Sequence, residues 1–146
     1  MTPLIDKARI SALIPHAGPM CLLDGVRDWG QTTITCVASS HRARDNPLAA
    51  DGRLDVVCGI EYASQAMALH ATLTGNRPRP AAGYLASVRD VVCSVERLDL
   101  LDGDLLVSAE LLIAEAGRVI YRFHLTAGAQ PVMSGRAAVV INAGSI

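Results

Sequence analysis

A single carboxylate stands among apolar and small residues in the stretch Val56 to Leu73, VVCGIEYASQAMALHATL. An acid in such a stretch is expected to be paired or chemically active, because burying an unpaired charge is costly. Gln65 follows Glu61 by four residues and shares its face if the stretch is helical. We interpret the two as a site for proton transfer, in which Gln65 orients Glu61 or contacts substrate. The alternative is structural, with Glu61 binding N–H groups of the first turn and Gln65 bonding a neighbouring element.

Proton transfer needs a second group, and the chain has four histidines. His16 lies in a turn-rich segment and His41 begins a polar loop, so either is a candidate partner of Glu61. Their structural alternatives are a turn residue that caps backbone groups and a solvated loop residue. His70 follows Glu61 by nine residues, which places it on the opposite side of a helix and predicts a structural role. His124 lies in an alternating strand pattern and is expected on a sheet surface.

Composition predicts one globular domain. The chain has 146 residues, enough for a proper core, and 51% of them are apolar while only 3% are aromatic. The core must therefore be built from Val, Leu, Ile and Ala. A formal net charge of −1 gives no general attraction to nucleic acid or to an acidic membrane. The N-terminal segment lacks a signal-peptide pattern and no segment approaches a membrane span, so we expect a soluble, cytoplasmic protein.

The four cysteines, Cys21, Cys36, Cys58 and Cys93, are widely spaced and contain no CxxC pair. This spacing argues against a zinc site and against a disulfide framework, and favours buried free thiols. No cluster of metal ligands and no glycine-rich nucleotide loop is evident. We therefore expect no metal and no cofactor.

The order of elements predicts an α+β fold. A short amphipathic helix over Asp6 to Leu13 precedes two strands joined by a turn at Trp29, the first of them through Leu22, Leu23 and Val26. A long loop covers His41 to Asp55. The long helix follows and ends near Gly75. The rest of the chain predicts strands in Tyr84 to Leu98, LLVSAELLIAEA, RVIYRFHLTA and VMSGRAAVVI. We expect a single domain over residues 1–146, with a curved antiparallel sheet around one long central helix and dimerisation through an edge strand.

This element order resembles the hotdog fold, and two segments extend the resemblance to a family. The opening LIPHAGPMCLLDGV resembles the LPHR-PFLLVDRV opening of 3-hydroxyacyl-[acyl-carrier-protein] dehydratases. The helix GIEYASQAMA is similar to their LEAMAQ helix, with Glu61 and Gln65 at the same spacing. The motifs PHxGxMCLLD and GIEYAxQAMA are most similar to those of the dehydratase-like subunits of aryl polyene biosynthesis.

The resemblance implies half of a dehydratase site. It places the catalytic acid at Glu61 and implies that backbone N–H groups beside Gly59 bind the thioester oxygen. The family's histidine segment GHFPG has no counterpart, because NPLAADGRLDVVCGIE contains no histidine and the missing residue would fall at about Gly52. His16, His41 or a histidine from another hotdog subunit must then complete the site. We expect the acyl tunnel to be lined by Met20, Leu48, Met67 and Tyr84.

We accordingly expect a dehydratase that acts on 3-hydroxyacyl thioesters of acyl carrier protein or coenzyme A, as a homodimer or as a heterodimer with another hotdog subunit. One alternative is a non-catalytic hotdog subunit that stabilises a partner or binds an acyl chain. A further alternative is a hotdog thioesterase, in which the helix acid activates water. An acidic carrier protein would need a basic surface, for which the candidates are Arg42, Arg44 and Arg53, or Arg77 and Arg79.

Overall fold

The computed structural model describes residues 4–14, 18–75, 83–115 and 117–141, without the side chains of residues 19, 83–86 and 141. The helices, 3₁₀ turns and strands are, in chain order, β1 (Ile5–Asp6), α1 (Lys7–Leu13), η1 (Gly18–Met20), β2 (Gly25–Trp29), β3 (Thr33–Ala38), η2 (Ser40–Arg42), η3 (Val56–Cys58), α2 (Gly59–Leu73), β4 (Gly83–Cys93), β5 (Leu105–Glu115), β6 (Arg118–Ala127) and β7 (Gln130–Ile141).

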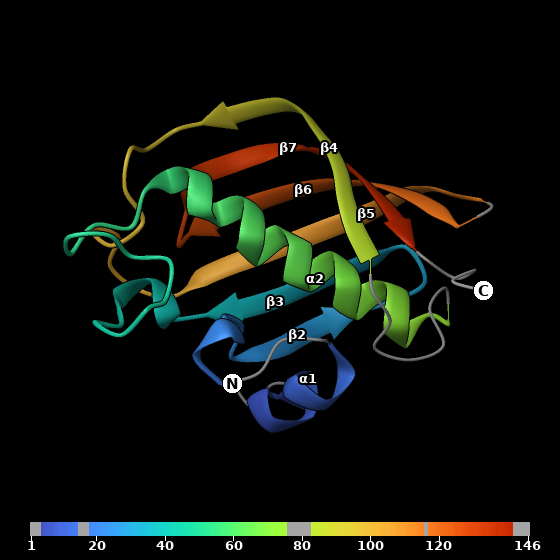
Figure 1. The fold of residues 1–146 in the computed structure, drawn as a ribbon, viewed down its shortest axis with the longest axis horizontal. Coiled ribbons are helices and arrows are strands. Elements are labelled where there is room, and N and C mark those ends of the chain that lie inside the picture. The colour runs from blue at the N-terminus through green and yellow to red at the C-terminus, as the bar shows by residue number, and fades with distance from the viewer. Residues whose placement is uncertain (1–3, 15–17, 76–82, 116, 142–146) are drawn as a thin grey trace.

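One curved sheet wraps around α2 (Figure 1). Its seven strands are all antiparallel and follow the order β1-β2-β3-β5-β6-β7-β4. The strands β5, β6 and β7 form the predicted meander, and β4 pairs with β7 at the far side of the sheet. This is the expected hotdog architecture. The helix α2 packs on the apolar face of the sheet, and α1 lies beyond β2.

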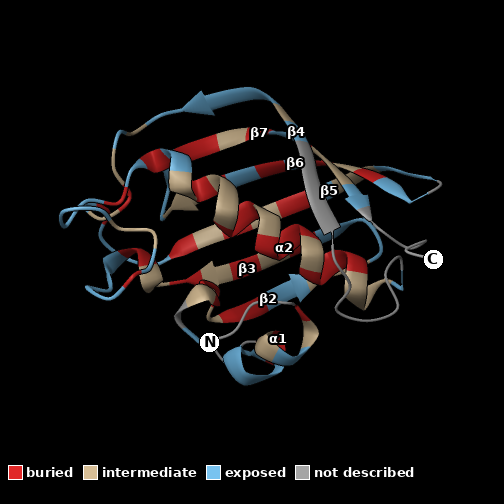
Figure 2. Cartoon of the chain, in the orientation of Figure 1, coloured by how far each residue is buried: buried red, intermediate tan, exposed pale blue. Residues whose placement is uncertain are grey.

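Alternation of buried and more exposed residues along the strands creates the apolar face of the sheet. In β3, Ile34, Cys36 and Ala38 are buried while the residues between them are more exposed, as the pattern predicted. The helix contributes small residues such as Ala63 and Ala66, which allow it to lie close to the sheet. Figure 2 shows the buried residues concentrated on α2 and on the strands beneath it. Burial of aliphatic surface between these two layers is the main stabilising contribution.

The long helix starts later than predicted. Residues Val56–Cys58 form the 3₁₀ turn η3, and the α-helix begins at Gly59. The carboxylate of Asp55 accepts a hydrogen bond of 2.9 Å from the Val57 N–H, and this cap stabilises the tighter turn. At the other end Gly75 has a φ of 82°, the left-handed geometry that its predicted role as a helix stop requires.

Two strands are also shorter than predicted. Leu22 and Leu23 are fully buried but precede β2, which begins at Gly25. Their backbone groups bond to side chains of other elements, Leu22 to Gln65 and Ser40 and Leu23 to Lys7. The strand predicted from Tyr84 to Leu98 ends at Cys93, after a register shift at Asp90, whose φ is 55°. A left-handed residue interrupts regular pairing and turns the strand end.

The cysteines are all free, but they are not all buried. Cys21 and Cys36 lie in the core, Cys58 is partly buried and Cys93 is exposed at the end of β4. Burial raises the pKa of Cys36 to about 12, so this thiol behaves as an apolar core residue. The prediction of buried thiols was therefore wrong for Cys93, whose strand ends at the edge of the sheet.

Candidate active site

Glu61 lies in the first turn of α2, where it is partly buried. The start of this helix is pressed onto β6 and β7 at Gly59, where an added Cβ would lie 3.2 Å from both Leu125 Cδ2 and Met133 Sδ. The Gly59 N–H donates to the carbonyl groups of η3 and so is used within that turn. Gly59 therefore fixes the position of the acid through close packing with the sheet.

Gln65 holds the segment before β2 against α2. It is fully buried, its Oε1 accepts a 2.9 Å hydrogen bond from the Leu22 N–H, and its Nε2 donates at 2.7 Å to the Met20 carbonyl. Both ends of the amide are thus bonded to the same short segment. Met20 is the last residue of η1 and Leu22 belongs to the CLLD motif that follows it, so Gln65 anchors this segment beside the helix that carries Glu61.

Tyr62, next to Glu61, is the centre of a buried polar network that sequence reasoning missed. Its hydroxyl lies 2.7 Å from Ser40 Oγ and accepts a 3.1 Å hydrogen bond from Asn46 Nδ2. Ser40 Oγ also donates to the Leu22 carbonyl at 2.7 Å. The proton of Ser40 is used on Leu22, so Tyr62 must donate to Ser40.

This network orders the loop after β3. Asn46 Nδ2 donates a second hydrogen bond to the Ser40 carbonyl at 2.8 Å, and its Oδ1 accepts from the Leu48 N–H at 2.8 Å. Burial raises the pKa of Tyr62, which keeps its hydroxyl protonated. The polar atoms of the network are paired, so it positions the loop and the first turns of α2 relative to each other. A tyrosine beside the acid and an Asn-Pro pair in the loop were the available sequence signals.

His41 is buried rather than solvated. Its Nε2 lies 3.2 Å from the Leu101 carbonyl, which makes Nε2 the protonated nitrogen, and its Nδ1 has no hydrogen-bond partner. Burial is the main cause that lowers the pKa of His41. In the part of the chain that the structure describes, no hydrogen bond joins His41 to Glu61. His41 instead connects η2 to the segment before β5.

His70 and His124 have the structural and the sheet-surface position that the sequence predicted. His70 is fully buried, with Nε2 2.8 Å from the Gly30 carbonyl and Nδ1 2.8 Å from the Tyr121 hydroxyl. Burial lowers the pKa of His70, and the carbonyl partner requires Nε2 to carry the proton. His124 is exposed on the outer face of β6. His16 lies outside the described residues.

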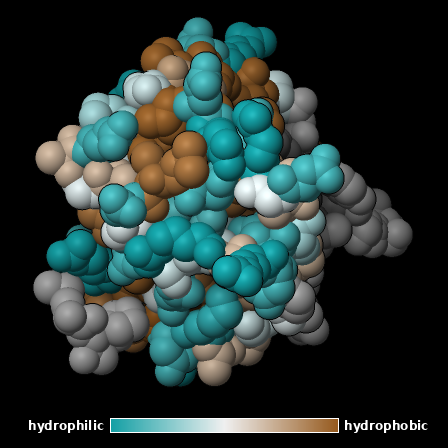
Figure 3. All heavy atoms as spheres, turned by 90° about the vertical axis from the view of Figure 1, so that its left-hand side faces the viewer, coloured by the Kyte–Doolittle hydropathy of each residue, from teal (hydrophilic) through white to brown (hydrophobic). Residues whose placement is uncertain are grey.

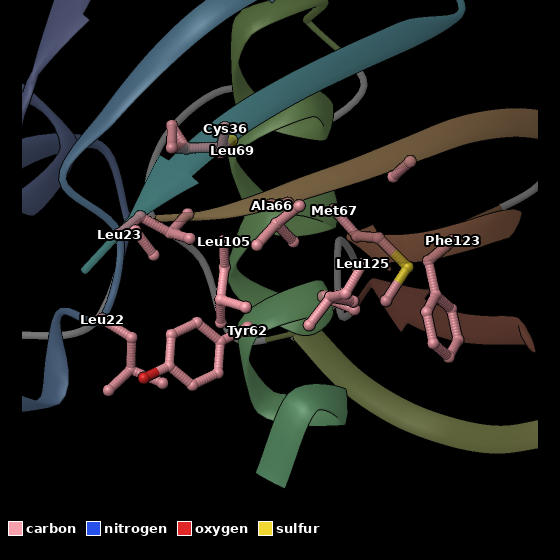
Figure 4. Packing of buried hydrophobic residues seen from close by; sticks show 14 of the residues in the cluster. Leu22, Leu23, Cys36, Tyr62, Ala66, Met67, Leu69, Leu105, Phe123 and Leu125 are labelled. Atoms are coloured by element: carbon pink, nitrogen blue, oxygen red, sulfur yellow. The ribbon is translucent and has the colours of Figure 1, made fainter. Parts of the chain in front are cut away.

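The predicted tunnel residues occupy different environments. Met67 is 1% exposed and lies in the core, where Figure 4 shows it directed toward Phe123 and Leu125. Met20 and Leu48 are partly buried near the start of α2, beside the segments bonded by Gln65 and Asn46. Tyr84 belongs to β4, but its side chain lies outside the described part of the structure. Met20 and Leu48 are thus the described members of this set that lie near the surface.

The end of the molecule that carries the start of α2 also exposes apolar side chains. Figure 3 views this end and shows hydrophobic atoms gathered on its upper part, next to hydrophilic ones. Val57 in η3 and Leu100 before β5 are 56% and 67% exposed. Exposed apolar groups beside a candidate site favour contact with another protein surface.

No group of metal-ligating side chains is found among the described residues. Within the same residues, no helix has the length and apolar character needed to cross a membrane.

Comparison with protein families shows the family to which the chain belongs. The ApeP dehydratase family matches residues 8–143, which cover nearly the whole sequence. The chain belongs to the ApeP-like dehydratase family. The resemblance inferred from the two sequence segments is thereby confirmed. No curated protein sequence matches this ApeP-like chain.

Solved structures agree on the fold of the ApeP-like chain. The ApeI:P dehydratase heterocomplex from Xenorhabdus doucetiae contains a chain that is 22% identical, with a TM-score of 0.78 and 90% of each chain covered. A protein described as a thioesterase from Silicibacter sp. TM1040 is 16% identical, with a TM-score of 0.67 and coverage of 97% of this chain and 94% of that one. A mutant thioesterase from Pseudomonas aeruginosa is 11% identical, with a TM-score of 0.59 and coverage of 80% and 79%. At these identities the similarity supports the hotdog fold, which both kinds of enzyme share.

Proposed function

We propose that the chain is the acid-bearing subunit of a 3-hydroxyacyl-thioester dehydratase and that a second hotdog subunit supplies the histidine. Membership of the ApeP-like dehydratase family supports the reaction class. The observation that carries the proposal is the position of the three described histidines, which leaves His16, outside the described residues, as this chain's own alternative. His41 and His70 are bonded elsewhere, and His124 is exposed on the outer sheet face.

The reaction needs two groups that transfer protons, one at each end of the carbon–carbon bond that becomes the double bond. A base removes the proton from the carbon next to the thioester, and a second group assists loss of the hydroxyl as water. Glu61 would serve the hydroxyl, as proton donor or by orienting a water, while the partner's histidine would remove the proton. The similar ApeI:P structure is itself named a dehydratase heterocomplex, which supports a site shared between different subunits.

The thioester would be carried by acyl carrier protein or coenzyme A. Exposed Arg42, Arg44 and Arg53 lie in the loop that Tyr62 and Asn46 order, close to the start of α2. This loop is the proposed contact surface for an acidic carrier protein, although Arg42 already forms a 2.9 Å ion pair with Asp104. Arg77 and Arg79, the other predicted candidates, lie outside the described residues.

Activity with and without a partner tests the proposal. The isolated chain should form little enoyl product from a 3-hydroxyacyl thioester, and mixing with a histidine-bearing hotdog subunit should restore turnover. Glu61→Gln in the complex should lower kcat by about 10²- to 10⁴-fold, the usual contribution of a general acid or base. Glu115→Gln, which alters an exposed carboxylate in β5, is the matched control and should keep full activity.

Three results would contradict the proposal in different ways. Strong activity of the isolated chain would show that no partner histidine is needed, and its loss in His16→Ala or His41→Ala would assign the histidine to this chain. Full activity of the Glu61→Gln complex would favour a non-catalytic subunit. Release of free thiol without enoyl product would favour a thioesterase, the activity ascribed to two of the similar structures.

A further inference from the structure

The outer face of the sheet carries arginines in direct cross-strand register. Arg89 of β4 lies opposite Arg136 of β7, and Arg136 lies opposite Arg122 of β6. All three residues are exposed. Like charges placed directly opposite each other destabilise a sheet. Arg122 forms a 3.2 Å ion pair with Glu110, which offsets part of this repulsion at one end of the row.

Beside this row the surface is hollow. A depression of about 140 Å³ is lined by Ser87, Arg89, Arg118, Ile120, Arg136, Ala137 and Ala138. Ala138 lies opposite Ser87 on one side and Ile120 on the other, so these three uncharged side chains form the middle of its floor. Arg89 and Arg136 stand at one end of this floor and Arg118 at the other. The lining thus places three guanidinium groups around a shallow space, and we call it the arginine hollow.

The positive charge of the arginine hollow is not balanced locally. Over the described ranges, none of Arg89, Arg118 and Arg136 forms an ion pair, although Glu115 lies opposite Arg118 in the strand register. No carboxylate lines the hollow. Three cations around a small space without a counter-charge form a site that attracts anions.

We propose that the arginine hollow binds a compact polyanion of the phosphate or phosphate-ester class. Guanidinium groups match phosphate oxygens with paired hydrogen bonds, and the Ser87 hydroxyl lies in the same lining. A phosphate group carries about 1.5 to 2 negative charges, so one or two linked groups balance three arginines. Carboxylates of a protein partner would need to converge in the same space, where they would repel each other.

The site is separate from the candidate active site. The neighbours of Arg118 and Arg122 along β6, Val119, Tyr121 and Phe123, are buried toward the core, so the arginines face away from α2. Pairing of β4 with another strand would use the edge of β4 and leave the outer face open. Within the proposed class, the ligand is a free phosphate or diphosphate, or the phosphate-bearing end of a larger molecule such as coenzyme A.

Titration of the full-length chain with inorganic diphosphate tests the arginine hollow. We expect saturable binding that shifts the arginine Nε–H signals in NMR spectra, raises Tm and weakens with added salt. Arg136→Gln should weaken binding by about tenfold or more, because it removes the arginine at the centre of the register row. Arg27→Gln, which alters an exposed arginine of β2, is the matched control and should bind as the wild type does.

Comparison of ligands distinguishes the sources and the rival partner class. Tighter binding of coenzyme A than of diphosphate, lost in Arg136→Gln, would assign the hollow to a coenzyme, whereas equal binding would assign it to free phosphates. No saturable diphosphate binding, or an equal loss in Arg27→Gln, would overturn the proposal. Binding of poly-glutamate without binding of diphosphate would overturn it in favour of an acidic protein surface. Because Glu61→Gln should retain diphosphate binding, failure here is separable from failure of the proposed dehydratase function.

Discussion

Among the described histidines, His41 and His70 lie in the interior, and each donates from Nε2 to a backbone carbonyl. Burial lowers the pKa of both side chains from the ordinary value of 6.5. The unfolded chain therefore binds protons at a higher pH than the folded chain does. Stability is fully present above pH 6.5 and is lost as the pH falls from there toward the folded-state pKa values.

This difference predicts a pH-dependent free energy of unfolding. Below about pH 6.5 the free energy should fall by about 1.4 kcal/mol per pH unit for each histidine, until the folded protein also takes up the proton. Urea unfolding of the wild type and of His41→Gln, measured between about pH 7.5 and 5, checks this sign and slope. The variant should show a shallower decline. Equal slopes in both proteins would remove His41 from the explanation.

Polar residues at the start of α2 contribute mainly by fixing the positions of neighbouring segments. Gln65 bonds the backbone at Met20 and Leu22, and Tyr62 reaches Ser40 and Asn46. Each of these bonds connects segments that are distant in sequence. The spacing of Glu61 and Gln65 predicted a shared helix face, but it carried no information on which segment the amide would meet.

At the scale of elements, close contact between neighbouring strands depends on Gly135 in β7. A Cβ at this position would lie 2.8 Å from Phe123 Cζ and 3.2 Å from Val91 Cγ2. Phe123 is fully buried and has little freedom to move. The strand thus needs a residue without a side chain where it crosses this ring.

We predict that Gly135→Ala lowers the free energy of unfolding by about 1–3 kcal/mol, the usual cost of overpacking a core. Chemical denaturation measures the change. Gly30→Ala is the control, because no atom lies within 4 Å of a Cβ at Gly30. A Gly135→Ala protein as stable as the wild type would show that β7 and Phe123 can separate at low cost.

Regular elements were predictable from the sequence because their patterns are local. Alternation in β3 and the turn signals around β5, β6 and β7 predicted both the strands and their meander. The burial of His41 depends on its contact with Leu101, and the early end of β4 at Cys93 follows the left-handed Asp90. No local pattern reveals either feature. The candidate site shows the same division, since Glu61 was placed correctly on α2 while the network around Tyr62 depends on long-range contacts.

At the scale of the whole molecule, β4 leaves one side of the sheet unpaired. It bonds only to β7 within the described strands, and Val92 in this strand is 59% exposed. An exposed edge is a surface on which another strand can add. The second hotdog subunit that the proposed function requires could join the sheet at this edge.

We predict that Val92→Lys prevents assembly through β4, because a charged side chain on an edge strand opposes pairing with another chain. Val140→Lys is the matched control: Val140 is 42% exposed, but its strand β7 is paired on both sides, with β4 and β6. Light scattering after size-exclusion chromatography should show the smaller species for Val92→Lys and an unchanged assembly for Val140→Lys. If the proposed dehydratase site spans two subunits, Val92→Lys should also lose turnover in the mixture with a histidine-bearing partner. Assembly that survives Val92→Lys would place the contact elsewhere, and the exposed Val57 and Leu100 at the start of α2 would then be the surface to alter.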